Sequence, residues 1–249
     1  MNRLGKLIIE TGTKCYAWAL MPNHFHLLLK TGDKPISKMM QRLLTGYAIT
    51  FNRKHRRVGH LFQNRYKSIL CQEDIYLKEL IRYIHLNPLR VKIVESQKQL
   101  DTFSYSGHST IKGNRDLNWQ EVEFVLSLFA TTRSGAQIKY DQFMKDGTNQ
   151  GNREDLIGGG LIRSNGGWDK VKSFRKTKEF LKSDERILGE SDFVNEVLQS
   201  AQEKTNRGNH FQNPKMTYHD LMRTVSSLFE IVPRKVASKN KERNIVQAR

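Results

Sequence analysis

Two histidines separated by one apolar residue, His24 and His26, have a spacing that suits metal binding. Side chains two residues apart on a β-strand point to the same face and lie roughly 7 Å apart along the chain. Two imidazoles at that span can bind one ion, because neutral imidazole is a ligand for several transition metals. The alternative is a pair of histidines that are satisfied by neighbouring groups, and spacing alone leaves it open.

A tyrosine and an asparagine four residues apart, Tyr83 and Asn87, share one face of a predicted helix. The amide oxygen of Asn87 is a hard ligand that Mg²⁺ or Mn²⁺ accepts. Tyr83 is a candidate nucleophile, since a phenol with a pKa of about 10 can attack a phosphate that a metal polarises. Tyr76 lies on the same face, so spacing does not decide between the tyrosines, but the link to Asn87 favours Tyr83. The alternative is a core tyrosine on an amphipathic helix.

The composition favours nucleic acid as the partner. The 249 residues include 42 Lys and Arg against 25 Asp and Glu, which gives a formal net charge of +17. Each phosphate that a cation neutralises releases condensed counterions, so a chain this basic usually binds a polyanion. Two cysteines fit no disulfide framework, and the sequence has no signal peptide and no run long enough to cross a bilayer. We therefore expect a reduced cytoplasmic location and no membrane partner.

The histidines and the tyrosine would be positioned by strands and a helix. Residues 15–30 predict two strands, or one kinked strand, broken at Pro22, with His24 and His26 on one face and a core face opposite. Asp74 is a plausible N-cap for a helix over about 75–86. Pro88 should end this helix and leave the Asn87 side chain free to turn toward a site.

Basic residues cluster after a second predicted helix, over residues 36–51. This cluster suits phosphate contact, although a solvated helix end would have the same composition. Two further cations lie in the loop that follows. The candidate DNA-contacting residues in this part of the chain are Arg53, Lys54, Arg56, Arg57, Arg65 and Lys67.

Three separated segments, residues 21–30 (MPNHFHLLLK), 58–70 (VGHLFQNRYKSIL) and 76–94 (YLKELIRYIHLNPLRVKIV), resemble HUH single-tyrosine transposases of the REP-associated type. These belong to the IS200-like transposase superfamily, and the resemblance covers about residues 13–112. It implies His24, His26 and Asn87 as ligands of Mg²⁺ or Mn²⁺, and Tyr83 as the nucleophile. The implied fold is α+β, with a ferredoxin-like antiparallel sheet, helices on one face and a mostly helical, basic C-terminal region.

The resemblance also implies an activity: metal-dependent nicking and strand transfer of single-stranded DNA at hairpin repeats. The tyrosine would form a 5′-phosphotyrosine link and release a 3′-OH. We expect single-stranded hairpins as partners of a monomer or homodimer, in the bacterial cytoplasm at the nucleoid. The predicted division is a catalytic domain over 1–112, a helix and linker over 113–167, and a helical basic region over 168–249.

Residues 216–249 resemble the start of the DNA-binding domain of the bacterial replication initiator, which implies duplex DNA as a further partner. We expect an incomplete recognition unit, because further helices follow in that domain. Relatives also carry a strand and most of a helix before the strand at Cys15, so we expect the sheet to lack one member. The basic residues of this C-terminal segment are Arg234, Lys235, Lys239, Lys241 and Arg243.

Three other functions are compatible with parts of this pattern. A catalytically inactive, truncated relative would bind DNA in a salt-sensitive way without a covalent product. A metallohydrolase that uses water would keep its activity in a Tyr83→Phe variant. A packaging protein would explain the charge but not three motifs in order.

Overall fold

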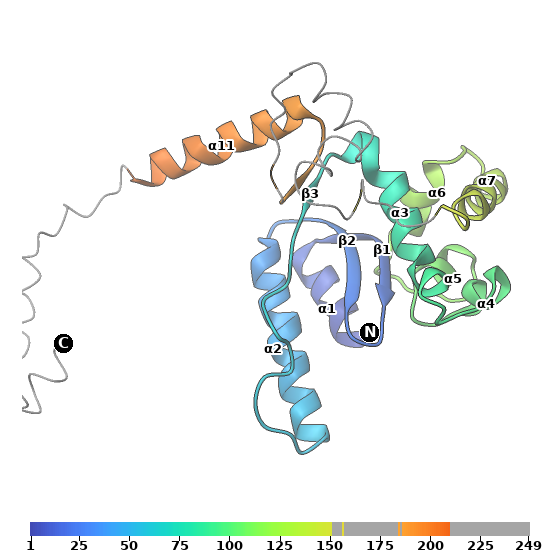
Figure 1. Ribbon diagram of the computed structural model, residues 1–249, viewed down its shortest axis with the longest axis horizontal. Coiled ribbons are helices and arrows are strands. Elements are labelled where there is room, and N and C mark those ends of the chain that lie inside the picture. The colour runs from blue at the N-terminus through green and yellow to red at the C-terminus, as the bar shows by residue number, and fades with distance from the viewer. Residues whose placement is uncertain (151–155, 157–183, 185, 210–249) are drawn as a thin grey trace, which may run out of the picture. The chain divides into compact units, whose positions relative to one another are not determined.

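The computed structural model describes residues 1–150, 156, 184 and 186–209 (Figure 1). The chain divides into two compact units, Met1–Asn195 and Glu196–Arg249. The elements are α1 (Asn2–Thr11), β1 (Lys14–Leu20), β2 (Phe25–Lys30), α2 (Ile36–Lys54), β3 (Leu70–Cys71), α3 (Glu73–Arg90), α4 (Gln97–Thr102), α5 (His108–Ile111), α6 (Val122–Ser127), α7 (Arg133–Asp146), β4 (Ile187–Leu188) and α11 (Ser191–Asn209).

β1 and β2 form an antiparallel hairpin, with Trp18 opposite Leu27 and Ala19 opposite His26. The chain turns after Met21, whose N–H donates to the His24 carbonyl at 2.9 Å, and this confirms the predicted break at Pro22. In the described residues, the antiparallel sheet consists of these two strands, and the short β3 pairs in parallel with β4. The α+β class is confirmed.

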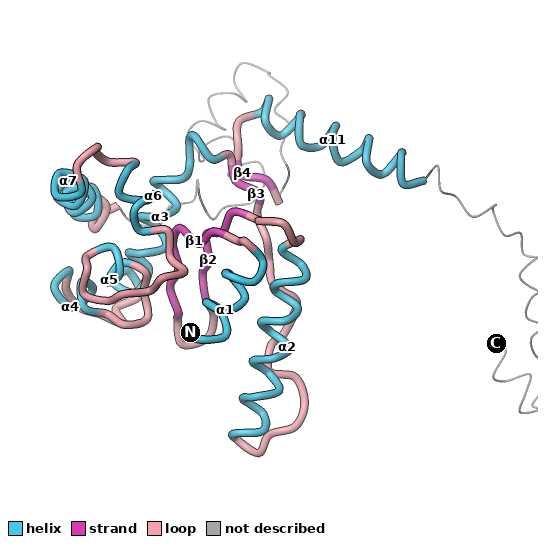
Figure 2. Tube along the Cα trace, turned by 180° about the vertical axis from the view of Figure 1, so that it is seen from behind, coloured by secondary structure: helices cyan, strands magenta, loops and turns pink. Residues whose placement is uncertain are grey.

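Helices pack against both faces of the hairpin, which positions α3 on the face that carries His26 (Figure 2). Leu27 and Leu29 lie in a cluster with apolar residues of α1 and α2, whereas Leu28 packs against a second cluster that includes Ile81 and Ile84 of α3. The alternation predicted from the sequence therefore holds, but the core face and the histidine face are both covered by helices.

The second cluster continues beyond the predicted domain boundary at residue 112. Val125 of α6 and Tyr140 and Met144 of α7 are fully buried in it. The sequence predicted a helix and linker over 113–167, and two helices, α6 and α7, form in its first part. The core contacts of α7 come from a few large side chains rather than from a long apolar stripe.

Two predictions about α3 are wrong. The helix begins at Glu73, with Gln72 in the N-cap position instead of Asp74, and it continues past Pro88 to Arg90. A proline lacks an N–H donor, so it removes one backbone hydrogen bond from a helix. Near the end of a helix this loss is small, because the carbonyls that follow still accept hydrogen bonds from later N–H groups. The Asn87 carbonyl accepts from Val91 N–H at 3.1 Å, and the Pro88 carbonyl from Ile93 N–H at 2.8 Å. Asn87 is therefore buried within the helix, not released at its end.

The predicted helix over 36–51 is confirmed as α2, which extends further, to Lys54. Among the described helices, none combines the length and apolarity that a bilayer crossing needs. The predicted initiator-like segment, 216–249, lies outside the described residues, as do its basic residues Arg234, Lys235, Lys239, Lys241 and Arg243.

Candidate active site

The packing of α3 on the hairpin brings Tyr83 against His26. Their ring centroids are 6.0 Å apart with planes at 81°, and the rings of His26 and His24 are 4.9 Å apart at 87°. Two histidines that neighbour each other on β2 and its preceding turn thus meet a tyrosine from an element much later in the chain. The sequence predicted this grouping, and the structure brings the three rings together.

His26 has the chemical state that a metal ligand needs. Its Nε2 is buried and has no hydrogen-bond partner within the part of the chain that the structure describes. Burial, and then the proximity of His24, lower the pKa of His26 to about 4. The imidazole is therefore neutral at physiological pH, with a lone pair that is not used by the protein.

His24 is exposed beside it. Its Nδ1 lies 2.6 Å from the Asn23 Oδ1. An amide oxygen only accepts, so Nδ1 carries a proton and donates to it. Such a bond to the other ring nitrogen is the usual way in which a ligating histidine is oriented.

Tyr83 is half-buried, and burial is the main reason that its pKa is raised above the ordinary value of 10. The positive charge of Arg90 and a hydrogen bond from Asn87 act in the opposite direction. The Arg90 guanidinium lies 5.3 Å from the centre of the Tyr83 ring. The phenol is thus protonated at rest, with two groups beside it that favour the phenolate.

Tyr76, the other tyrosine on this helix face, has no described ring contact with His26, although Tyr83 also packs against the cluster that buries Tyr76. Tyr76 is buried in a third cluster with Leu80, Leu156 and Leu188. Of these two tyrosines, only Tyr83 is in ring contact with His26 among the described contacts, so the structure distinguishes them where the sequence alone could not.

The donor atoms at this site fit a divalent cation. They are the imidazole nitrogens of His24 and His26, together with the amide oxygen of Asn87 one turn after Tyr83 on α3. The unpartnered Nε2 of His26 is the observation that supports the fit, because a buried ring nitrogen usually has a partner. Within the described residues, no group of three or more His, Cys, Asp or Glu side chains is placed to hold a metal, so Asn87 is needed to complete three protein ligands.

The predicted DNA-contacting cations of the first unit are exposed. Arg53 and Lys54 form the last turn of α2, and the others lie in the segment before β3. All six, Arg53, Lys54, Arg56, Arg57, Arg65 and Lys67, are accessible to a polyanion.

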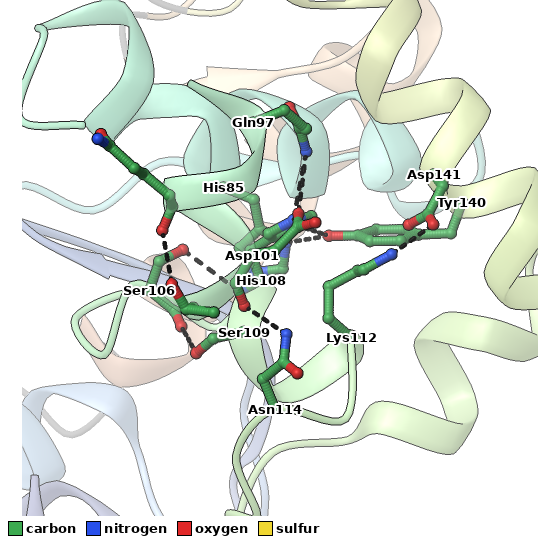
Figure 3. Close-up of polar contacts among 12 residues, drawn as sticks. His85, Gln97, Asp101, Ser106, His108, Ser109, Lys112, Asn114, Tyr140 and Asp141 are labelled. Atoms are coloured by element: carbon green, nitrogen blue, oxygen red, sulfur yellow. Dashed lines mark hydrogen bonds and ion pairs between the residues drawn. The ribbon is translucent and has the colours of Figure 1, made fainter. Parts of the chain in front are cut away.

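A second cluster of histidines and a tyrosine, which sequence reasoning missed, lies on α3 and the helices that follow it (Figure 3). The Tyr140 hydroxyl is 2.9 Å from His85 Nδ1 and 2.7 Å from His108 Nδ1. His108 Nε2 is 2.8 Å from an Asp101 carboxylate oxygen. These residues come from four helices and show no common spacing, so no local pattern could have revealed them.

Residues 2–87 match the family model described as "Transposase IS200 like". No curated protein and no solved structure gives a match. The matched residues include His24, His26, Tyr83 and Asn87, together with α1, α2 and the hairpin. The match supports a transposase-type function in DNA transposition, with DNA as the partner.

Proposed function

We propose that this chain cuts and rejoins single-stranded DNA, with Tyr83 as the nucleophile and with Mg²⁺ or Mn²⁺ bound by His24, His26 and Asn87. The observation that carries the proposal is the packing of Tyr83 against His26, whose buried Nε2 has no partner among the described residues. Both residues lie within the segment that matches the transposase family model.

In the proposed reaction, the Tyr83 hydroxyl oxygen attacks the phosphorus of a DNA phosphodiester. A bond forms between the phenol oxygen and phosphorus, the bond from phosphorus to the 3′ oxygen breaks, and the leaving oxygen takes up a proton as a 3′-OH. The product is a 5′-phosphotyrosine link. Attack by a 3′-OH on this link reverses the step and joins two strands, so no external energy source is required.

The side chains around Tyr83 have definite parts in this step. Burial keeps the phenol protonated at rest, and Arg90 and Asn87 stabilise the negative charge that develops on its oxygen as the proton leaves. A bound divalent ion would supply polarisation of the scissile phosphate. His24 and His26 hold their rings at a fixed angle beside the tyrosine.

The substrate in this proposal is a hairpin-forming repeat, held through its backbone by the six exposed cations of the first unit. The resemblance of three ordered motifs to REP-associated transposases supports hairpin repeats in particular. Duplex binding through residues 216–249 and action as a monomer or homodimer at the nucleoid are parts of the same proposal.

A covalent-trapping assay tests the proposal. The chain is mixed with a labelled single-stranded hairpin oligonucleotide and Mn²⁺, and the products are separated on a denaturing gel. We expect a labelled band at the mass of the protein that is lost with Tyr83→Phe and with a chelator but persists with Tyr76→Phe. A shift on a native gel without this band would instead indicate a protein that only binds DNA, and cutting retained by Tyr83→Phe would indicate hydrolysis by water.

A further inference from the structure

The segment between β2 and α3 is basic in an unusual way. Residues 34–72 contain no aspartate and no glutamate, so their charge is not compensated locally. Their nine cations contribute more than half of the chain's net charge of +17. These cations are Lys34, Lys38, Arg42, Arg53, Lys54, Arg56, Arg57, Arg65 and Lys67.

Much of this segment projects from the body of the first unit. α1 lies along α2, with Arg42 paired to Glu10 at 2.7 Å and Arg3 donating to the Thr50 hydroxyl at 3.3 Å. Of the residues in α2, only Met39 and Met40 are buried. The end of α2 and the loop after it extend beyond the β1–β2 turn in both views (Figures 1 and 2). We call residues 47–67 the arm.

The arm has an internal structure built from aromatic rings. The ring centroids of Phe62 and Tyr47 are 6.2 Å apart, those of Tyr47 and Phe51 5.9 Å, and those of Phe51 and His55 4.2 Å. The Arg57 guanidinium lies 5.9 Å from the Phe51 ring centre. These rings form one continuous row with a cation at its side.

The loop of the arm is fixed to the end of α2. Arg57 N–H donates to the Asn52 carbonyl at 2.9 Å, and the Asn52 side-chain amide donates to the Gly59 carbonyl, also at 2.9 Å. Gly59 has a φ of 91°, which residues with a Cβ rarely adopt. The row of rings is therefore held in place by the backbone, although it does not belong to a hydrophobic core.

The row of rings is accessible at two of its members. Tyr47 is 50% exposed and His55 is exposed, and around them lie the cations of the arm. Tyr47 and Phe51 fit the apolar spacing of the helix predicted over 36–51, but neither is buried, and this part of α2 has no core to face. Exposed aromatic rings beside cations require a different explanation.

We propose that the arm binds single-stranded DNA, with unpaired bases stacked on Tyr47 and His55 and phosphates held by the surrounding arginines and lysines. Charge alone would suit any polyanion, but aromatic faces favour a single strand, because the bases of a duplex are already stacked on one another. An acid-free surface does not suit a second copy of this strongly basic chain. The inference rests on the proposed function, and it adds the surface that holds the strand outside the cutting site.

The arm and His24 lie at the same end of the hairpin, since the arm extends past the turn from which His24 enters β2 (Figure 1). α2 and α3 cover opposite faces of the hairpin, so a strand bound along the arm would lie outside the candidate active site. This placement assigns the arm to unpaired DNA flanking the cut.

Fluorescence anisotropy with a labelled, unstructured oligonucleotide and with its duplex tests the proposal. The full chain carries Tyr83→Phe and a chelator is present, so no cutting occurs. We expect Tyr47→Leu to weaken single-strand binding about tenfold, the loss of roughly one stacked base, with duplex binding unchanged. Tyr47→Phe should bind normally, because it keeps the ring. Tyr105→Leu is the matched control, since Tyr105 is 56% exposed outside the arm.

A second pair of variants tests the charge. Arg56→Gln combined with Arg57→Gln should reduce the slope of log affinity against log salt by about 1.4 for the single strand, whereas Lys98→Gln should leave it unchanged. The proposal is overturned if Tyr47→Leu has no effect, if it weakens duplex and single strand equally, or if it changes self-association in sedimentation. Because Tyr83→Phe protein is used, a failure here leaves the trapping assay intact, and a failure of that assay leaves this binding test valid.

Discussion

α3 carries two clusters of histidine and tyrosine that differ in access to solvent. In one, Tyr83 is half-buried beside His26, and His24 is exposed. In the other, Tyr140 is completely buried and bonds to both His85 and His108. The same residue types therefore form an open group with an unused lone pair and a closed group whose hydroxyl is fully bonded.

In the closed cluster, the donor and the acceptor of the hydrogen bond between His108 and Asp101 can be assigned. The Asp101 carboxylate only accepts, so His108 donates from Nε2. The Tyr140 hydroxyl has one hydrogen, so it donates to at most one of His85 Nδ1 and His108 Nδ1 and accepts from the other ring. One atom, His85 Nε2, is buried without a described partner, but a Cβ on Gly107 would lie 2.9 Å from it, so backbone closes the space. Residue type alone therefore does not identify a reactive site, whereas an open approach to an unused lone pair does.

The largest expected effect comes from the open cluster. Tyr83→Phe removes the attacking oxygen, so we expect complete loss of the covalent adduct with a hairpin oligonucleotide. Stability should change by less than about 0.5 kcal/mol, because the ring and its packing remain. The trapping gel and thermal unfolding measure the two quantities. Tyr140→Phe, the same substitution in the closed cluster, is the matched control, and adduct formation by Tyr83→Phe would contradict the assignment.

A substitution of His26 should lower activity but leave the free energy of unfolding unchanged or higher. His26→Leu removes a buried nitrogen that has no partner in the part of the chain that the structure describes, so we expect the free energy of unfolding to be unchanged or higher. Adduct formation should fall about 100-fold or more, since even partners of metal ligands cost 10–100-fold when removed. Titration with Mn²⁺ and the trapping gel measure these effects. Adduct formation at the normal rate would exclude His26 as a ligand.

In the closed cluster, we expect a substitution to lower the free energy of unfolding rather than activity. Tyr140→Phe leaves His85 Nδ1 and His108 Nδ1 buried without their shared partner. We expect the free energy of unfolding to fall by about 2–3 kcal/mol, at roughly 1 kcal/mol or more for each unsatisfied atom. Urea denaturation measures the change, with the exposed Tyr105→Phe as control. A loss below about 0.5 kcal/mol would mean that the cluster is not held by these bonds.

The two clusters also differ in how far the sequence could predict them. His24 and His26 are two residues apart where β2 begins, and Tyr83 and Asn87 are one helical turn apart, so local periodicity was sufficient to group each pair. The hairpin, α2 and α3 were predicted for the same reason, as segments with regular apolar spacing. Burial, by contrast, was needed to separate Tyr83 from Tyr76.

Non-local contacts explain what the sequence missed. His85, His108 and Tyr140 meet only after α3, α5 and α7 pack together, and nothing in their spacing indicates it. Pro88 was expected to end α3, but a proline in the last turn costs few hydrogen bonds, and Asn87 is buried as a result. The outer half of α2 has an apolar pattern without a core beneath it, which periodicity cannot distinguish from a buried face.

The smallest effect is expected at the end of the closed cluster, where Asp101 is partly exposed. The hydrogen bond from His108 is the main reason that the Asp101 pKa is lowered below its ordinary value of 3.8. A lowered carboxyl pKa contributes stability above 3.8 that is lost as the pH falls through the folded value. Asp101→Asn should therefore be less stable than the wild type by less than about 1 kcal/mol near neutral pH, as for a partly screened pair.

This difference between the wild type and Asp101→Asn should shrink toward zero below pH 3.8, because protonation removes the same charge from the wild type. Urea denaturation of both proteins across the acid range measures it, with Asp116→Asn as the control. A difference that stays constant with pH would show that the carboxylate charge is not what His108 recognises. The closed cluster would then depend on the shape of its hydrogen bonds alone, with Tyr140 as the single residue that determines its stability.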